Sequence, residues 1–135
     1  MSWSEKLQKN RASGVIVKNH SVLLIHRFSD GKEYWVLPGG AVEAGETNEE
    51  ALDREMKEEL CIEVKNKNFL FEIEYLGRKE YHYSITEYIG EPKLGGLELE
   101  RSNSENQYIL TWVPLEKVKE IKVLYPKGIV EKIIN

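Results

Sequence analysis

The sequence predicts a layered domain of the α/β or α+β class, in which one strong amphipathic helix lies among short strands. Apolar segments typical of strands are interleaved with segments of helical periodicity, and the interleaving favours helices packed on a sheet. Turn signals rich in Asn, Asp, Gly and Pro separate these segments. A chain of 135 residues with 41% hydrophobic content fits one domain, and we expect that domain to cover residues 1–135.

The N-terminal part is predicted to form three strands. Residues 14–17 and 22–26 are short apolar runs on either side of an Asn19-His20-Ser21 turn. A second turn signal at residues 29–32 precedes a strand over residues 34–37, which Pro38-Gly39-Gly40 should end.

The best helix in the chain is expected over residues 47–60. Thr47 and Glu50 have the three-residue spacing of a capping box, which satisfies free amides at a helix start. Four apolar residues recur at helical spacing and should face the core, namely Ala51, Leu52, Met56 and Leu60.

The C-terminal half is predicted to add strands and a closing helix. Residues 62–75, 81–89 and 108–113 have strand character, and the second of these alternates around Tyr83 and Ile85. Residues 91–96 are expected to be a loop. Residues 126–134 are predicted to form the last helix, with a buried stripe of Ile129, Val130, Ile133 and Ile134.

Composition limits the classes of partner. The net charge of −4, from 19 Lys and Arg against 23 Asp and Glu, argues against broad nucleic-acid binding, which needs a basic surface. No run approaches the roughly 20 apolar residues of a membrane helix, so no membrane partner is expected. The single cysteine and the absence of a signal-like N-terminus favour a cytoplasmic location.

Three carboxylates fall on one strip of the predicted helix. Glu55 lies one turn before Glu58 and Glu59, beside the apolar stripe, so their mutual repulsion would be felt in poorly polar surroundings. A divalent cation would remove that repulsion, and ligands that are all oxygen suit Mg²⁺. Taken alone, the strip also fits a solvated helix face in which Arg54 and Glu58 form a surface pair.

The spacing between this strip and an upstream glycine pair decides between these interpretations. Five residues separate Gly40 from Glu46, and seven more precede the run Arg54-Glu55-Met56-Lys57-Glu58-Glu59-Leu60-Cys61-Ile62. This pattern resembles the Nudix box, G-x5-E-x7-R-E-U-x-E-E-x-G-U, where U is a bulky aliphatic residue. The chain is therefore identified as a member of the Nudix hydrolase family, for which the resemblance implies an α/β/α sandwich with a mixed β-sheet.

Cys61 is the one departure from the pattern, because it replaces the second glycine. That glycine follows the helix, where a left-handed residue is favoured. A cysteine costs about 1 kcal/mol if that conformation is kept, and the alternative is a different end to the helix. We expect a small buried residue here rather than a reactive thiol.

The resemblance implies a hydrolase that cleaves a diphosphate bond in a small nucleotide-like substrate, with Mg²⁺ as cofactor and Mn²⁺ as an alternative. It assigns metal binding to Glu58, Glu59 and the Gly39 carbonyl. Glu55 is either a third ligand or the base that takes the proton of the attacking water, and we favour the ligand. Glu46 and Arg54 are expected to hold the loop and helix together, so that the ligands stay in place.

Other site residues are weaker predictions. Many relatives use one more acid from a later loop, and the candidates are Glu98, Glu100 and Glu105, of which Glu105 is preferred. Four residues are candidates for substrate binding, by stacking on a base or meeting a phosphate: Arg27, Tyr34, Tyr81 and Tyr83. Each of them also fits ordinary strand packing.

The substrate is left open. Nucleoside triphosphates, dinucleoside polyphosphates and nucleotide sugars all satisfy the box, with small triphosphates ahead. Two alternatives are an RNA 5′-end pyrophosphohydrolase, which would need a basic channel, and a nucleotide sensor without catalysis, which need not keep all three glutamates. A homodimer is also open, because many relatives form one.

Overall fold

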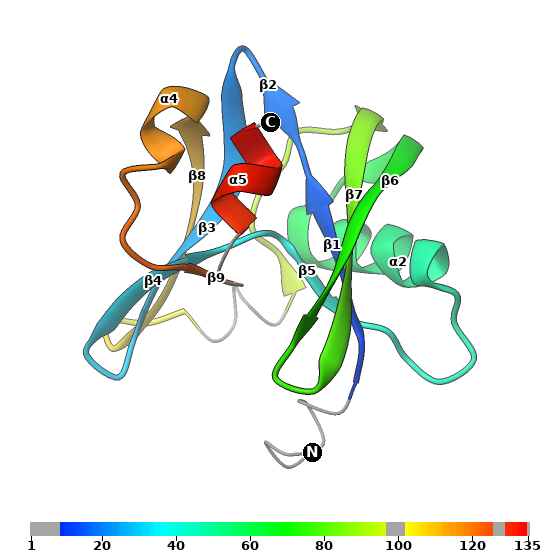
Figure 1. The fold of residues 1–135 in the computed structure, drawn as a ribbon, viewed down its shortest axis with the longest axis horizontal. Coiled ribbons are helices and arrows are strands. Elements are labelled where there is room, and N and C mark those ends of the chain that lie inside the picture. The colour runs from blue at the N-terminus through cyan, green and yellow to red at the C-terminus, as the bar shows by residue number, and fades with distance from the viewer. Residues whose placement is uncertain (1–8, 97–101, 126–128, 135) are drawn as a thin grey trace.

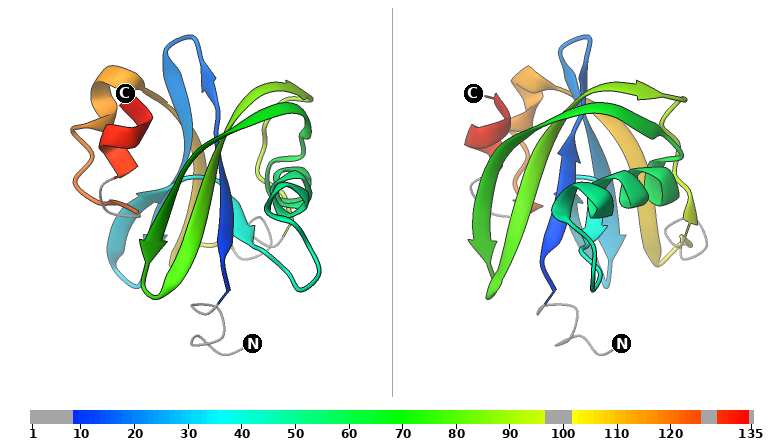
Figure 2. Two further views of the ribbon diagram at one scale, coloured as in Figure 1. Left: turned by 45° about the vertical axis from the view of Figure 1, so that its right-hand side comes forward. Right: turned by 90° about the vertical axis from the view of Figure 1, so that its right-hand side faces the viewer.

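The computed structural model describes residues 9–96, 102–125 and 129–134, and its secondary structure is arranged in layers. Two β-sheets form the middle of the molecule, with helix α2 on one side and helices α4 and α5 on the other (Figures 1 and 2). The predicted layered class with a mixed sheet is therefore confirmed. Among the described residues, no helix has both the length and the apolar character needed to cross a membrane.

The first sheet, called sheet A, holds the strand that contains the glycine pair. Its strand order is β5-β1-β7-β6, where β1 runs parallel to β7 and the other neighbours are antiparallel. The strands are β5 (Gly39–Ala41), β1 (Arg11–Val15), β7 (Arg78–Ile89) and β6 (Glu63–Tyr75). Sheet A is thus a mixed sheet with β5 at one edge, beside α2.

The second sheet, called sheet B, is built around strand β3, which pairs with β8 along its full length and with β4 on the other side. Strand β4 also pairs in parallel with β9, and β2 pairs with the start of β3. The strands are β2 (Val17–Lys18), β3 (Ser21–Ser29), β4 (Lys32–Val36), β8 (Asn106–Pro114) and β9 (Leu124–Tyr125).

Helix α2 (Asn48–Leu60) begins where the capping box predicts. Thr47 Oγ1 accepts the Glu50 amide at 3.1 Å, and Glu50 Oε1 accepts the Thr47 amide at 2.9 Å. The other helices are short, α4 (Leu115–Val118) and α5 (Ile129–Ile134). The predicted closing helix is therefore present from Ile129 onward, while residues 126–128 lie outside the described part of the chain.

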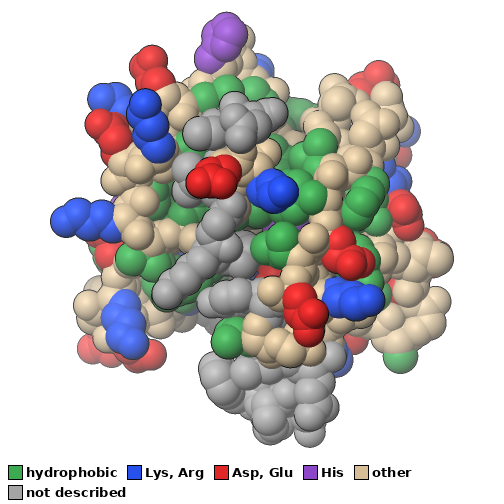
Figure 3. All heavy atoms as spheres, in the orientation of Figure 1, with side chains coloured by type: hydrophobic (Ala, Val, Ile, Leu, Met, Phe, Trp, Pro, Cys, Tyr) green, Lys and Arg blue, Asp and Glu red, His purple; other side chains and the backbone are tan. Residues whose placement is uncertain are grey.

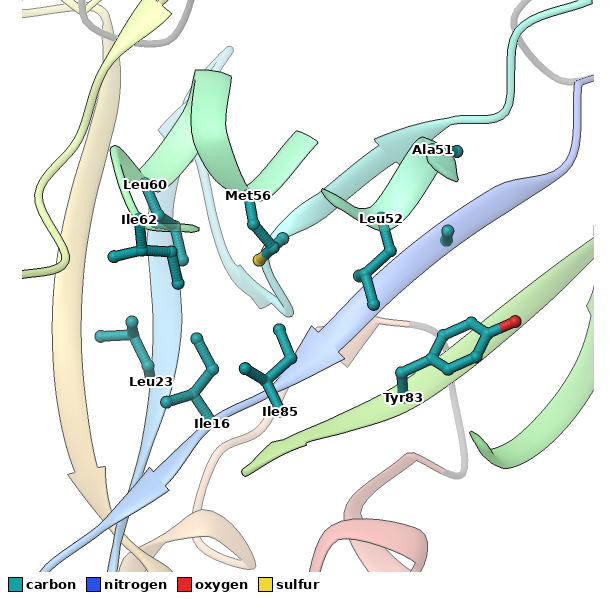
Figure 4. Close-up of a cluster of buried hydrophobic side chains, with 10 residues drawn as sticks. Ile16, Leu23, Ala51, Leu52, Met56, Leu60, Ile62, Tyr83 and Ile85 are labelled. Carbon is teal, nitrogen blue, oxygen red and sulfur yellow. The ribbon is translucent and has the colours of Figure 1, made fainter. Parts of the chain in front are cut away.

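Two apolar clusters hold the layers together. The first packs α2 onto both sheets (Figure 4) and consists of Ala12, Ile16, Leu23, Ala51, Leu52, Met56, Leu60, Ile62, Tyr83 and Ile85. All four apolar positions predicted on the helix are in it. The second cluster joins sheet B to α4 and α5 and includes Val22, Leu24, Leu37, Val118 and Ile129. Burial on both faces explains why the central strands are apolar over consecutive residues.

Three short elements were not expected from the sequence. Gly39–Ala41 was predicted to end a strand, yet it forms β5 by pairing with β1. Helix α4 and strand β9 are also new. Each is only two to four residues long, so the local pattern is too weak to show it, and long-range pairing or packing decides its structure.

Cys61 ends α2 in the left-handed conformation, with φ 59° and ψ 33°. The Ile62 amide donates to the Met56 carbonyl at 3.3 Å, which closes the helix end and turns Ile62 into the core. The chain therefore keeps the backbone that favours glycine. The expectation that Cys61 is buried was wrong, because the residue is exposed.

We predict that Cys61→Gly stabilises the protein. Relief of the left-handed strain is worth about 1–2 kcal/mol, and the extra entropy of glycine in the unfolded chain offsets about half of it, for a net gain of about 0.5–1 kcal/mol. Urea denaturation measures the difference. Cys61→Ala is the control, since it removes the thiol and keeps the strain. A gain of equal size in both variants would show that the thiol, rather than the backbone, carries the cost.

Candidate active site

The centre of the candidate site is Arg54, which lies on α2 and reaches back to the chain before the helix. Its guanidinium donates to both Glu46 carboxylate oxygens, at 2.7 and 3.0 Å, and to the Ala41 carbonyl at 2.9 Å. Glu46 also accepts the Glu43 amide. The bidentate pair lowers the pKa of Glu46 and raises that of Arg54, so both groups stay charged. The predicted link between loop and helix is thus formed.

Arg54 also contacts two of the three glutamates on the strip. Its Nη1 donates to Glu55 Oε1 at 2.9 Å and to Glu58 Oε2 at 3.2 Å. The positive charge therefore lies between carboxylates that would otherwise repel one another at helical spacing. This contact orders the strip.

Glu55 is held against the glycine strand. A methyl group added to Gly40 would overlap the Glu55 carboxylate, so glycine at this position makes room for it. Burial raises the pKa of Glu55, and the hydrogen bond from Arg54 opposes that rise. Burial therefore favours the neutral form of Glu55, whereas the contact with Arg54 favours its charged form.

Glu59 and Glu58 differ sharply in exposure. Glu59 is 3% exposed, and its Oε1 accepts the Gly39 amide at 3.3 Å. The Glu58 side chain is 59% exposed. The strip therefore runs from a buried carboxylate at the glycine strand to an open one at the surface.

The donor chemistry of this strip fits a hard divalent cation. All of its side-chain groups are carboxylates, and the glycines leave space beside them. Across residues 9–96, 102–125 and 129–134, however, no three His, Cys, Asp or Glu side chains converge closely enough to hold a metal ion. The described side chains are instead arranged around Arg54 and the Gly39 amide, and the Gly39 carbonyl has no contact that tests its predicted role.

Among the later acids, only Glu105 lies within the described residues, and it is not brought to the strip. Glu105 is exposed in the turn before β8, where its amide donates to Asn103 Oδ1 at 2.9 Å. It lines a surface pocket with the β3–β4 hairpin. Glu98 and Glu100 lie outside the described residues.

The four candidates for substrate binding lie in two places. Arg27 donates to Asn106 and to the Gln107 carbonyl, and it stacks on Tyr108 at 3.5 Å with Tyr34 at 5.6 Å. Tyr81 is half-buried against the core under α2. Tyr83 is 3% exposed and its hydroxyl contacts Glu49, whereas stacking on a base needs an open ring face. The structure gives Tyr83 a packing role.

A polar cavity of about 70 Å³ lies between the sheets, and it was not anticipated from the sequence. Its charged and hydroxyl side chains are Arg11, Ser13, Arg78, Glu80 and Tyr125. Ser13 lies directly against Gly39. The alternation Arg78, Glu80, His82 on one strand face was the signal that could have found it. The alternation predicted for that strand concerned only its other face, around Tyr83 and Ile85.

His82 is fully buried behind this cavity, and neither ring nitrogen has a hydrogen-bond partner among the described residues. Its ring stacks on Phe71 at 4.6 Å. Burial, with a smaller contribution from the Arg11 charge, lowers the pKa of His82 to about 4. The imidazole is therefore neutral at pH 7.

Comparison with known proteins shows one family. A family model described as NUDIX domain matches residues 8–131. An 8-oxo-dGTP diphosphatase of Haemophilus influenzae is 34% identical over 88 residues, 60% of this chain and 65% of that protein. An ADP-ribose pyrophosphatase of Methanocaldococcus jannaschii is 48% identical over 58 residues, 42% of this chain and 34% of that one. The chain thus spans less than two thirds of these curated relatives.

Solved structures agree with the observed fold. The structure of MutT, from a study of the Aliivibrio salmonicida and Vibrio cholerae proteins, superposes with a TM-score of 0.72 at 21% identity, over 93% of this chain and 96% of the other. A MutT NUDIX hydrolase of Burkholderia pseudomallei gives a TM-score of 0.65 at 26% identity, over 80% and 84% of the two chains. At 21% identity, the similarity to the MutT structure of the first comparison concerns the fold alone.

The buried histidine predicts a loss of stability in acid. Because the folded-state pKa of His82 is depressed from 6.5 to about 4, the unfolded chain takes up a proton first as the pH falls between these values. The free energy of unfolding should drop by about 3 kcal/mol over that window. Urea denaturation between pH 7 and pH 4 measures this slope.

The matched variants for that measurement are His82→Gln and His20→Asn. His82→Gln should flatten the slope, whatever its effect on stability at pH 7. His20 is an exposed residue in the β2–β3 turn, so its replacement should leave the slope unchanged. A slope that persists in His82→Gln would assign the acid sensitivity to another group.

Proposed function

The chain belongs to the Nudix family, and from that membership we propose that it is a divalent-metal-dependent pyrophosphohydrolase acting on a small nucleotide. The observation that carries the proposal is the arrangement around Arg54. The family's arginine joins loop, helix and two glutamates, and its glycines leave room for Glu55. A protein that only sensed nucleotides would not require this complete arrangement.

In the proposed reaction, water attacks one phosphorus of a diphosphate and the bridging P–O bond breaks. A nucleoside triphosphate would thus give a nucleoside monophosphate and pyrophosphate, and the proton of the water would be released. Glu55, Glu58 and Glu59 would hold the cation, Mg²⁺ or alternatively Mn²⁺, with the Gly39 carbonyl as a further contact. When bound, the cation would neutralise phosphate charge and make the attacking water more acidic.

The remaining steps belong to the protein's own residues. Glu55 is half-shielded from water and has a raised pKa, which suits a group that either binds the cation or accepts the proton of the water. Arg54 and Glu46 act as positioning residues, because their contacts set the distance between the strip and the glycine strand. Errors of about 1 Å in such positions cost catalysis heavily.

A small nucleoside triphosphate is the preferred substrate. Two curated relatives, named for 8-oxo-dGTP and ADP-ribose, support nucleotides as the class. Arg27 with Tyr34 on sheet B offers a cation and an aromatic ring to such a substrate. Dinucleoside polyphosphates and nucleotide sugars are secondary candidates. Glu105 is a further proposed metal ligand. For this role, the turn before β8 would have to move toward α2 when substrate or metal binds.

The alternative of an RNA 5′ end receives no support from the surface. On the face shown in Figure 3, Lys and Arg side chains are interspersed with Asp and Glu. Lys9, near the start of the described chain, is paired with Glu43 at 2.9 Å. A small substrate fits this surface better, because it needs no basic track.

The deciding experiment is an assay of purified protein with a panel of nucleotides, including 8-oxo-dGTP, dinucleoside polyphosphates and ADP-ribose. We expect release of a monophosphate with Mg²⁺, loss of turnover after chelation by EDTA, and recovery with added Mg²⁺ or Mn²⁺. Turnover should rise toward alkaline pH, where the attacking water ionises more readily. Binding of nucleotides with no turnover on any of them would favour a sensor and refute the proposal.

We predict that Glu58→Gln lowers kcat by at least ~10²-fold, on the scale of lost charge stabilisation at an active site. Its melting temperature should stay within a few degrees, because the side chain is mostly exposed. The control is Glu91→Gln, an exposed loop carboxylate outside the strip, which should keep normal kcat. If the single variants Glu58→Gln and Glu59→Gln both kept near-normal turnover, the strip would be excluded as the metal site.

A further inference from the structure

One wall of the cavity between the sheets is formed by charged side chains. Arg11 and Glu80 are register partners on β1 and β7, and Arg78 lies two residues before Glu80 on its own strand. These three side chains therefore project from the same face of sheet A, away from the cluster under α2. Glu80 is paired with the Arg78 guanidinium, and Arg11 lines the same cavity from the neighbouring strand.

The hydrogen bonds of these residues leave specific atoms open. Arg78 donates through Nε and Nη2 to the same oxygen, Glu80 Oε2, at 3.3 and 3.1 Å. Arg11 donates through Nε to Ser13 and through Nη2 to the Leu37 carbonyl. Within the described chain, Glu80 Oε1 has no partner closer than His82 Nε2, at 4.0 Å. The wall thus offers one open acceptor, Glu80 Oε1, together with N–H donors of Arg11 and Arg78 that these hydrogen bonds do not use.

This group is poorly explained as a stabilising ion pair. Glu80 is 2% exposed, and a buried pair offsets its desolvation only with short contacts and every lone pair satisfied. Charge-assisted hydrogen bonds between such groups are ordinarily about 2.7–2.9 Å, shorter than those of Arg78. Beside the pair, His82 is buried with both ring nitrogens unpartnered. The unmet hydrogen-bonding capacity points to a ligand.

The cavity also lies next to the proposed catalytic strip. Ser13 and Leu37 line it, and Ser13 is in contact with Gly39, whose amide binds Glu59. A nucleotide with its phosphates at the glycine strand could therefore place the edge of its base in the cavity. The volume of about 70 Å³ accommodates such an edge.

We propose that Arg11, Glu80 and Arg78 form a specificity pocket for a nucleobase edge of the imide type, a carbonyl, an N–H and a second carbonyl in a row. The inference rests on the proposed function, and it names the class of base. Each carbonyl would accept from one arginine, and the N–H would donate to Glu80 Oε1. Uracil and thymine carry this edge, and so does an 8-oxopurine of the guanine series, through O6, N7–H and O8.

The ordinary purines and cytosine do not match this order of donors and acceptors. Unmodified guanine offers two acceptors on its major-groove edge, so N7 would face the Glu80 carboxylate. Its other edge places an amino group against an arginine. Adenine and cytosine likewise present an amino donor to a guanidinium. Binding one of these bases would leave a buried charged group of the pocket without a hydrogen-bond partner. This cost makes the pocket selective for a base with the matching edge.

The test measures binding rather than turnover, by isothermal titration calorimetry of the full chain with nucleoside monophosphates in one Mg²⁺ buffer. We expect 8-oxo-dGMP, dUMP or both to bind at least about tenfold more tightly than dGMP, dAMP and dCMP, as for hydrogen bonds to charged groups. The two imide nucleotides distinguish an oxidised purine from a pyrimidine as the source. Equal affinity for all five, no binding, or a preference for dAMP, dCMP or dGMP would overturn the proposal.

Variants tie the preference to the pocket. Glu80→Gln and Arg11→Met should each reduce it to within about threefold, and Arg11→Met decides if Glu80→Gln does not fold. Lys67→Met, which removes a cation paired with Asp53 outside the cavity, should keep the full preference. An unchanged preference in Arg11→Met and in folded Glu80→Gln would refute the pocket. Base preference without hydrolysis of any triphosphate would refute only the proposed function, whereas hydrolysis without base preference would refute only the pocket.

Discussion

The fork of hydrogen bonds from Arg54 is the constraint on which the rest of the site depends. One planar guanidinium joins the Glu46 carboxylate, the Ala41 carbonyl and two glutamates of its own helix. A lysine could not make these contacts together, because an ammonium has no rigid fork. The helix, the loop before it and the carboxylates are therefore fixed relative to one another by a single side chain.

The ends of helix α2 and the glycine strand make that constraint effective. The Thr47 capping box fixes where the helix begins, and Cys61 turns the chain so that Ile62 enters the core. Between these ends, Met56 and Leu60 bury the side of the helix next to the carboxylates. The glutamates consequently have little freedom to move as a group, and glycine at position 40 admits the Glu55 carboxylate where any side chain would displace it.

The sequence was informative wherever spacing along the chain encodes the contact. The helix, its cap, its apolar stripe and the roles of Arg54 and Glu46 follow from residues within 23 positions of one another. The sequence was uninformative where a contact depends on which strands pair in a sheet. Strands β5 and β9 are too short to show a pattern, and the cavity combines β1 with β7, which are more than 60 residues apart. The burial of Tyr83 is a related case, since strand type does not reveal which side chains a neighbouring element covers.

A double-mutant cycle on kcat tests most directly whether Arg54 and Glu46 act as one unit that positions the carboxylates. The variants are Arg54→Lys, Glu46→Gln and their combination, each checked for an unchanged fold by circular dichroism. If the fork is the shared constraint, each single change lowers kcat at least about tenfold and the double variant is no slower than the worse single one. Losses that multiply in the double variant would show that the two residues act independently, which would contradict this account.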